Sequence, residues 1–220
     1  MNRILKNLQD IQCKIDTAKV RIIAVTKYVG AEEILESYKA GLRDFAENRI
    51  QDAEIKRSKL PEEIEKNIIW HFIGHLQTNK AKKVVGGFEY IHSIDSLKLA
   101  ECVSEEAKIK GISQKVLIQV NVSEEKTKSG FSVKEIKEVF AELLNLESLN
   151  IVGLMTIAPH ISDEQELHSI FKELRELRDY LQKEFNCSLP ELSMGMSNDY
   201  QIAVTEGATM IRPGSLLFNK

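Results

Sequence analysis

The sequence predicts a (β/α)8 barrel, an α/β fold in which eight parallel strands alternate with helices. Short apolar runs and longer helix-like segments alternate along almost all of the 220 residues. Eight apolar runs are separated by seven helix-like segments, and one further helical segment leads the chain. This count fits a closed barrel, and the main rival is a doubly wound open sheet.

The predicted strands are short and apolar, as is typical of buried strands. We expect them near residues 22–26, 43–46, 69–73, 90–93, 115–122, 149–155, 191–193 and 210–213. We expect helices near residues 31–40, 48–59, 77–85, 96–110, 133–145, 163–185 and 198–206. The strands near 43–46 and 191–193 have only weak apolar patterns. We predict them mainly because strands and helices alternate along the rest of the chain.

The spacing of apolar residues also predicts a helix at the start of the chain. The residues that recur at helical spacing are Ile4, Leu8, Ile11 and Ile15. We expect residues 1–17 to pack on the barrel as this leading helix. No linker rich in glycine or proline and no internal repeat interrupts the sequence, so residues 1–220 are expected to form a single domain.

The helix predicted over 163–185 has the clearest pattern. Its apolar stripe consists of Leu167, Ile170, Phe171, Leu174, Leu177 and Leu181. Asp163, Ser96 and Ser132 each precede a helical segment, and their side chains are expected to cap these helices.

The strand near 115–122 favours a barrel over an open sheet. Side chains alternate between the two faces of a strand, and one face here consists of Val116, Ile118, Val120 and Val122. The other face carries Leu117, Gln119 and Asn121. In a barrel the first face meets the helices, while Gln119 and Asn121 point into the lumen near the mouth, where a ligand needs polar groups. The alternative is a strand with one partly solvated face.

The composition is that of an ordinary globular protein, with 43% hydrophobic residues and a net charge of −3. No basic field predicts nucleic acid or an anionic membrane as a partner. Residues 1–16 mix charges with apolar residues, unlike a signal peptide or a membrane span, so we expect a cytoplasmic protein.

The cysteines and histidines predict no metal site. Cys13, Cys102 and Cys187 lie far apart without a Cys-x-x-Cys pair, which favours buried free thiols over disulfides or zinc. His71 and His75 are four residues apart, but they flank a strand end and a glycine rather than lying on one helical face with a glutamate, as a zinc motif requires.

The first strand ends in a lysine, within the segment RIIAVTKYVG. Ile23, Val25 and Lys27 share one face of this strand because side chains alternate. If Ile23 and Val25 fill the barrel interior, Lys27 sits at the upper rim and is partly desolvated. Desolvation favours the neutral amine, a nucleophile that condenses with an aldehyde. The alternative is a strand-end lysine whose ammonium group reaches water.

Two later segments supply candidate groups for binding an anion. The segment LSMGMSNDY places Ser197 where a helix is expected to begin, either as an N-cap or as a hydroxyl beside free backbone N–H groups. In the segment MIRPGSLLF, Gly214 permits a close backbone approach and Ser215 adds a donor. Barrels of this type commonly hold phosphate in the loops after strands seven and eight, where both segments fall.

An amine after strand one and an anion site after strands seven and eight are neighbours around a closed barrel. Pyridoxal 5′-phosphate (PLP) is both an aldehyde and a phosphate ester. The sequence therefore predicts PLP as the ligand.

Seven motifs resemble those of the pyridoxal phosphate homeostasis proteins in the same order. They are AVTKYV, DFAENRIQDAEIK, WHFIGHLQTNK, IHSIDS, GLMTIAP, LSMGMSNDYQIAV and IRPGSLLF, and they span about residues 22–218. The resemblance implies a single barrel similar to the N-terminal domain of alanine racemase. It also implies a protein that binds PLP without an established enzymatic reaction. Two positions depart from the family pattern: Ala46, where glycine is frequent, and Asn219, where the last motif usually has glycine.

The resemblance also implies roles for individual residues. Lys27 is expected to hold PLP covalently as a Schiff base, Arg212 to face the pyridine nitrogen, and Asn48 to lie beside the cofactor. For Arg212 the alternative is a brace to a surface carboxylate, and for Asn48 it is a helix cap.

The phosphate-binding positions implied by the resemblance are Ser197, Gly214 and Ser215. Met155 and His75 lie in motifs that line the same pocket. The charged segment 124–130 is either a solvated connector or a lid or partner contact at the active face.

We expect a protein that holds PLP reversibly and helps to set its free level, rather than an enzyme. A guanidinium is always charged, so a pyridine nitrogen that faces Arg212 stays unprotonated and the ring is a weaker electron sink. A racemase also needs a second acid or base opposite the lysine, and none of the five tyrosines can be placed there. The alternatives are a PLP-dependent amino-acid racemase or related enzyme, and a barrel enzyme in which Lys27 attacks a sugar phosphate without a cofactor.

The partners follow from this reading. We expect PLP as the ligand, PLP-dependent apo-enzymes as recipients of the cofactor, and a monomeric chain.

Overall fold

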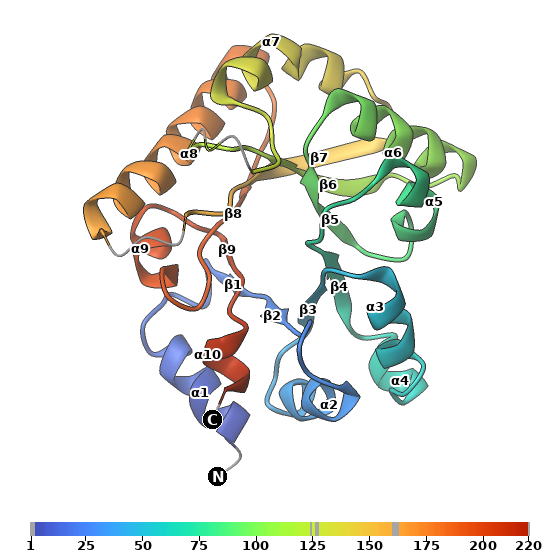
Figure 1. Cartoon of the computed structure of the whole chain (residues 1–220), viewed down its shortest axis with the longest axis vertical. Helices are drawn as coiled ribbons and strands as arrows, with labels where there is room; N and C mark the ends of the chain where they lie inside the picture. The colour runs from blue at the N-terminus through green and yellow to red at the C-terminus, as the bar shows by residue number, and fades with distance from the viewer. Residues whose placement is uncertain (1–2, 124, 126–127, 160–162, 220) are drawn as a thin grey trace.

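A computed structural model of the chain describes residues 3–123, 125, 128–159 and 163–219. Its strands form one parallel sheet in the order β1-β9-β8-β7-β6-β5-β4-β3-β2. β1 (Arg21–Ile22) and β2 (Ala24–Val25) are consecutive pieces of the first strand, and they pair with β9 and β3, respectively. The sheet therefore closes on itself, and the predicted barrel is confirmed (Figure 1).

The remaining strands agree with the predicted positions to within a few residues. They are β3 (Asp44–Glu47), β4 (Ile69–Phe72), β5 (Tyr90–Ile94), β6 (Gln114–Gln119), β7 (Leu149–Met155), β8 (Glu191–Ser193) and β9 (Met210–Ile211). The two weakly predicted strands, β3 and β8, both pair on two sides. Sheet pairing thus supplies the order that their short sequences do not.

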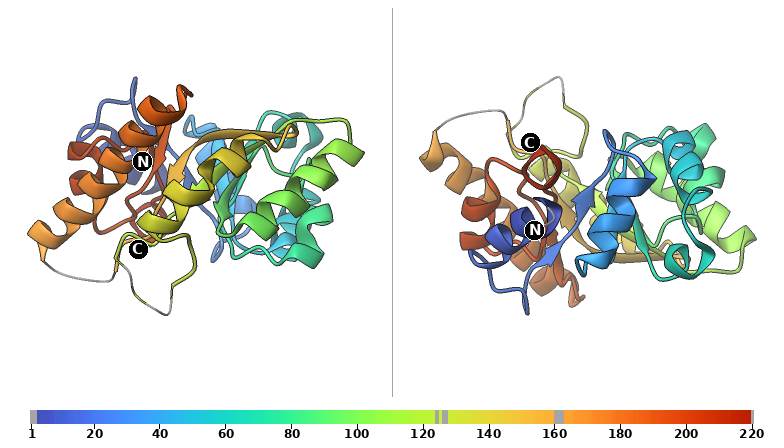
Figure 2. Two further views of the ribbon diagram at one scale, coloured as in Figure 1. Left: turned by 90° about the horizontal axis from the view of Figure 1, so that it is seen from above. Right: turned by 90° about the horizontal axis from the view of Figure 1, so that it is seen from below.

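Helices surround the sheet, as the views from above and below also show (Figure 2). The longer helices are α1 (Arg3–Gln12), α2 (Ala31–Lys39), α3 (Ile50–Arg57), α6 (Leu97–Ile109), α7 (Val133–Leu144), α8 (Glu164–Phe185) and α9 (Tyr200–Thr205). The short ones are α4 (Glu62–Glu65), η1 (Thr78–Lys80), α5 (Ala81–Val84) and α10 (Ser215–Phe218). The sequence did not predict α4 and α10, because four residues are too few to show a helical period.

The predicted caps are confirmed. Ser96 accepts a hydrogen bond from the Leu99 N–H, and Asp163 accepts two at the start of α8. Ser132 and Glu135 form a reciprocal capping box at the start of α7.

Apolar side chains pack in two layers around the sheet. The inner layer fills the lumen and consists of Ile23, Val25, Ala46, Tyr90, Leu117, Met155 and Met210. The outer layer joins strands to helices and includes Ala24, Val116, Ile118 and Val120. The predicted faces of the first strand, and of the apolar residues in the strand near 115–122, are therefore confirmed.

The leading helix α1 buries Ile4, Leu8 and Ile11 and contacts α2 and α10. Figures 1 and 2 show it beside α10, so the two ends of the described chain lie together. α1 ends at Gln12, which is earlier than expected, and Cys13 after it is exposed rather than buried. No helix among the described residues is long and apolar enough to cross a membrane.

Candidate functional site

A cavity of about 1050 Å³ lies where the strands end. The loops after β2, β3, β4, β7, β8 and β9 all contribute to its wall. The residues predicted for the site all line it: Lys27, Asn48, His75, Met155, Ser197, Arg212, Gly214 and Ser215. The structure therefore brings together side chains that are up to 188 positions apart in the sequence, from 27 to 215.

Lys27 lies two residues beyond the end of β2, and its side chain is exposed. The predicted desolvation by the protein is wrong, because no strand neighbour flanks the chain beyond Thr26. Within the described part of the chain the Lys27 ammonium forms no ion pair, and its Nζ lies 4.9 Å from the centre of the Tyr28 ring. An aldehyde that enters the cavity can therefore reach the amine.

Tyr28 also lines the cavity, and its side chain is 89% exposed. Tyr28 was not among the predicted site residues, because neighbouring residues on a strand point to opposite faces, whereas the strand has already ended here.

A buried ion pair fixes the residue that precedes Lys27. Glu47 is fully buried, and its Oε1 accepts a hydrogen bond from Lys56 Nζ at 2.7 Å and another from the Thr26 hydroxyl. Lys56 Nζ also donates to the Thr26 carbonyl oxygen at 2.7 Å. The backbone and the side chain of Thr26 are both held, so Lys27 starts from a fixed point although its own side chain is free.

Asn48 follows β3 and is half-buried. Its alternative role as a helix cap is wrong, since Arg49 is the N-cap residue of α3. A Cβ atom at Gly74 would lie 2.1 Å from the Asn48 carbonyl oxygen, so only glycine lets the loop after β4 approach Asn48 this closely.

Ser197 does not cap the helix that follows it, as one reading of the sequence expected. α9 begins at Tyr200, and Asp199 occupies the N-cap position. The Ser197 hydroxyl oxygen instead accepts hydrogen bonds from the Gly214 and Leu216 N–H groups, both at 3.1 Å. Both lone pairs are thereby used, so the hydroxyl proton is left to donate to a ligand.

Backbone N–H groups complete a cradle around this hydroxyl. In the described chain, the N–H groups of Ser197, Asn198 and Ser215 have no hydrogen-bond partner. Gly195 has φ +89°, a conformation that suits glycine and that turns the chain sharply before this segment. Unpaired N–H groups beside a serine proton form a site for an anion such as phosphate.

Gly214 joins this cradle for a reason other than strain. A Cβ atom there would lie 3.4 Å from Val25, an ordinary contact. The packing of the protein alone therefore does not require glycine at this position.

Arg212 is only 4% exposed, yet it lines the cavity. Its Nη1 donates to Ser193 Oγ at 2.6 Å and its Nη2 donates to the Thr156 carbonyl oxygen at 2.8 Å. Burial lowers the pKa of Arg212 to about 10, while the nearby Asp199 carboxylate acts in the opposite direction. The guanidinium is thus cationic at neutral pH, and no surface carboxylate of the described chain braces it.

Two other predicted residues have modest roles in this geometry. Met155 is buried in the lumen layer and forms part of the apolar wall. His75 is exposed, and its Nδ1 lies 3.2 Å from Asp95 Oδ2. His71 lies elsewhere, in the lumen. No cluster of metal-ligating side chains occurs among the described residues.

Gln119 and Asn121 do not line the cavity, contrary to expectation. Gln119 Nε2 donates to the Ser129 carbonyl oxygen at 2.9 Å, and Asn121 Nδ2 donates to that of Glu125 at 2.9 Å. Both amides therefore hold the following segment in place. The predicted lid over 124–130 includes residues 124 and 126–127, which lie outside the described residues.

Asp199 and Thr156 contribute to the site and were not predicted. Asp199 accepts a hydrogen bond from the Met196 N–H, which shapes the loop after β8. An aspartate just before a helical segment is a capping signal, so the sequence could have indicated it. Thr156 acts through its backbone carbonyl, for which the sequence carries no signal.

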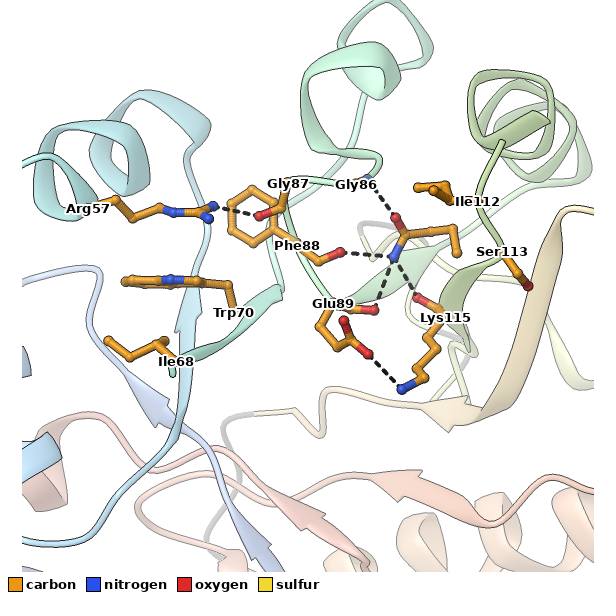
Figure 3. Close-up of a pocket in the computed structure, with 11 residues that line it drawn as sticks. Arg57, Ile68, Trp70, Gly86, Gly87, Phe88, Glu89, Ile112, Ser113 and Lys115 are labelled. Atoms are coloured by element: carbon orange, nitrogen blue, oxygen red, sulfur yellow. Dashed lines mark hydrogen bonds and ion pairs between the residues drawn. The ribbon is translucent and has the colours of Figure 1, made fainter. Parts of the chain in front are cut away.

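A second hollow of about 420 Å³ opens near the beginnings of β4, β5 and β6 (Figure 3). Its polar groups mostly bind one another: Arg57 donates to the Gly87 carbonyl oxygen, and Lys115 pairs with Glu89 at 2.6 Å. The buried Trp70 indole N–H has no partner among the described residues. This hollow contains none of the predicted site residues.

Fold and site together define a class of protein: a small α/β barrel with a reachable amine and an anion cradle at the carboxyl ends of its strands. The family model described as "Alanine racemase, N-terminal domain" matches residues 1–219. The chain belongs to this family and, within it, to the pyridoxal phosphate homeostasis proteins.

Relatives and solved structures agree on this assignment. The pyridoxal phosphate homeostasis protein of Aquifex aeolicus is 43% identical over 200 residues, which cover 91% of this chain and 86% of the relative. That of Synechocystis is 43% identical over 199 residues, which cover 90% of each chain. The structure of PipY from Synechococcus elongatus with PLP bound has a TM-score of 0.90 at 38% identity and covers 98% of this chain and 100% of PipY.

Solved structures of enzymes are similar to this chain in fold only. The structure of alanine racemase from Clostridium difficile has a TM-score of 0.79 at 16% identity, and it covers 100% of this chain but 57% of the racemase.

Proposed function

We propose that this chain binds PLP in the cavity at the barrel mouth and holds it covalently on Lys27. The observation that carries the proposal is the meeting of a reachable amine with an anion cradle in one cavity. The PLP-bound structure of PipY, a protein 38% identical to this chain, supports it.

The residues of the cavity fit PLP. The Ser197 proton and the unpaired N–H groups of Ser197, Asn198 and Ser215 are donors suited to a phosphate dianion. Arg212 has five N–H groups, and hydrogen bonds to Ser193 and Thr156 use two of them. The others have no partner among the described residues, so they remain for an acceptor such as the pyridine nitrogen. Asn48 and Met155 line the same cavity.

Bound PLP supplies an electrophilic carbonyl carbon and an aromatic ring that withdraws electrons. The chain's contribution is to orient that ring. Because Arg212 donates protons and does not give one up at neutral pH, the ring nitrogen opposite it stays an acceptor. A ring kept in this state stabilises carbanions poorly, so we propose storage and release of PLP rather than catalysis.

The wider role follows from reversible binding. We propose that the chain buffers free PLP, passes it to apo-enzymes that require it, and does so as a monomer in the cytoplasm. The names of the relatives, which describe homeostasis rather than a reaction, support this role.

Absorption spectroscopy of the purified protein tests the proposal. The protein incubated with PLP should show a visible band that borohydride removes, and intact mass should then show one PLP fixed to the chain. Lys27→Ala should lose both signals. Lys59→Gln, which alters an exposed lysine that does not line the cavity, is the control and should keep the band. A wild-type chain without the band, or a band that persists in Lys27→Ala, refutes covalent binding at Lys27.

A second experiment tests the absence of catalysis. Amino acids incubated with the PLP-loaded protein in deuterated water should gain no α-deuterium above the level of free PLP. Exchange that is faster than with free PLP and is lost in Lys27→Ala would establish an enzyme instead.

A further inference from the structure

A line of buried polar side chains crosses the lumen of the barrel beneath Arg212. Arg212 Nη1 donates to Ser193 Oγ at 2.6 Å, and Ser193 Oγ lies 2.9 Å from His92 Nδ1. His92 Nε2 lies 2.9 Å from His71 Nδ1, and His71 Nε2 lies 3.0 Å from Asp44 Oδ1. We call Ser193, His92, His71 and Asp44 the lumen chain.

The acceptor at one end and the donor at the other fix the direction of every hydrogen bond in the lumen chain when both rings are neutral. A carboxylate only accepts, so His71 Nε2 carries a proton toward Asp44. A neutral His71 then accepts at Nδ1, so His92 Nε2–H donates to it, and a neutral His92 accepts the Ser193 proton at Nδ1. Ser193 Oγ in turn accepts from the Arg212 guanidinium, which only donates.

The surroundings favour these neutral rings. Ser193, His92 and His71 are fully buried, and Tyr90 stacks on His71 with ring centres 4.7 Å apart. Burial lowers the pKa of His71, although Asp44 acts in the opposite direction. Burial lowers the pKa of His92 well below its ordinary value, and the positive charges of Arg212 and Arg21 act in the same direction.

The charged groups that face the two rings come from several strands. Arg21 (β1) lies 3.7 Å from Asp44 (β3) and 3.6 Å from Glu191 (β8). Asp44 and Glu191 are the carboxylates near His71, while Arg212 lies at the His92 end. The lumen chain thus has a cation at the cavity and carboxylates at the opposite end of the barrel.

We propose that the lumen chain positions Arg212: it holds the guanidinium in one orientation at the cavity and links it to Asp44 across three aligned neutral dipoles. Ser193, His92, His71 and Asp44 are positioning residues, since none of them lines the cavity. The effect on the cofactor rests on the proposed binding of PLP, but the order of the chain and its hold on Arg212 do not.

Two features give the lumen chain this role. In the low-dielectric lumen, aligned hydrogen bonds polarise one another, so the guanidinium gains more than a single neutral bond supplies. A buried cation without such partners is costly, and Arg212 has no carboxylate within ion-pair distance among the described residues.

Nitrogen NMR of the PLP-free protein tests the chain without reference to the cofactor. At pH 7 both His71 and His92 should appear as neutral rings with the proton on Nε2. The Arg212 guanidinium should give separate signals for its two terminal nitrogens, because Ser193 and Thr156 hold them in place. A ring protonated on Nδ1 or on both nitrogens, or a freely rotating guanidinium, would overturn the proposal.

Ser193→Ala breaks the link between Arg212 and the histidines. The two terminal nitrogens of Arg212 should then exchange and their signals should merge, and PLP affinity should fall at least tenfold with a shift of the visible band. Asp44→Asn keeps an acceptor for His71 but removes the charge, and it should weaken PLP binding less than Ser193→Ala does.

Ser93→Ala is the matched control, because Ser93 is a buried serine on β5 whose hydroxyl has no partner among the residues that the structure describes. It should leave the guanidinium signals, the affinity and the band unchanged. If Ser193→Ala behaves like Ser93→Ala in both assays, the lumen chain does not position Arg212. If the wild-type chain fails to bind PLP while the NMR signals are as expected, the proposed function fails and the inference about Arg212 stands.

Discussion

The two hollows at opposite ends of the barrel differ in what their polar groups already bind. At the mouth, the Ser197 proton, three backbone N–H groups and the Lys27 ammonium have no partner in the described chain. In the hollow of Figure 3, Arg57, Glu89 and Lys115 are paired within the protein. Both are polar and open, so polarity alone does not mark a ligand site. A ligand site is marked instead by donors that the protein holds in place but leaves unpaired.

The mouth also differs from the second hollow in how deeply the neighbouring polar side chains are buried. Beneath the free groups lie largely buried partners, Glu47 with Lys56 and the lumen chain with Arg212. In the second hollow the ion pair of Lys115 and Glu89 is itself exposed to solvent. Rigid, buried partners are costly to lose, whereas exposed pairs contribute little. This difference predicts the order of the effects of mutation.

The largest effect should follow from Lys56→Met. The substitution leaves the fully buried Glu47 carboxylate without its cation, which costs about 3–5 kcal/mol in buried pairs. Denaturant unfolding should show a loss of this size. Lys59→Met replaces an exposed lysine three positions away and should change stability by less than about 0.5 kcal/mol. Equal losses in both variants would show that the support beneath Lys27 is no stronger than the surface.

The next effect is the response of stability to acid. In the unfolded chain the pKa values of His71 and His92 are near 6.5, whereas in the folded chain both pKa values are lower. Below pH 6.5 the unfolded chain therefore binds protons that the folded chain excludes, and the free energy of unfolding falls. Above pH 6.5 the stabilisation is complete.

The slope should approach about 1.4 kcal/mol per pH unit for each histidine. Urea unfolding between pH 7.5 and pH 5.5, above the range of most carboxylates, measures it. His75→Gln alters an exposed histidine and should keep the slope. A wild-type protein of constant stability over this range would contradict the buried neutral rings.

Ser197→Ala should have a smaller and more local effect. It removes the proton that faces the cavity and leaves the Gly214 and Leu216 N–H groups without their acceptor. A lost hydrogen bond to a charged group costs about 1.5–3 kcal/mol, so affinity for PLP should fall about tenfold to a hundredfold by equilibrium titration. Affinity for pyridoxal, which lacks the phosphate, should change little. An equal loss for both ligands would place the phosphate elsewhere.

Lys115→Ala in the second hollow should have the smallest effect. The pair with Glu89 is exposed on both sides, so the free energy of unfolding should change by about 0–1 kcal/mol. PLP binding should stay at the wild-type level. A loss of PLP affinity in this variant would break the contrast between the two hollows.

The sequence predicts the barrel well because its signals are local and repeated. The alternation of Ile23 and Val25 against Ala24 already separates lumen from helix layer, and β3 and β8 follow from the order of the elements. The predicted site residues converge for the same reason: strand ends meet at one mouth.

The missed features depend on contacts between segments far apart in the sequence. Ser197 binds N–H groups seventeen and nineteen residues away, a pairing that no local capping rule contains. Gln119 and Asn121 have polar groups near the mouth, yet backbone carbonyls of the next segment take them. The lumen chain and Arg212 together join five strands or strand ends, so single strands give no hint of them.

The closure of the sheet also has a consequence for how the protein acquires its ligand. The first strand carries Lys27 at its end and pairs with β9, where Arg21 is opposite Met210. Contacts between such distant positions form slowly, since a long loop must first be ordered. A partly folded chain would expose the Lys27 amine without the anion cradle around Ser197, so it would bind an aldehyde only weakly. Tight binding of the ligand therefore indicates that the barrel is closed.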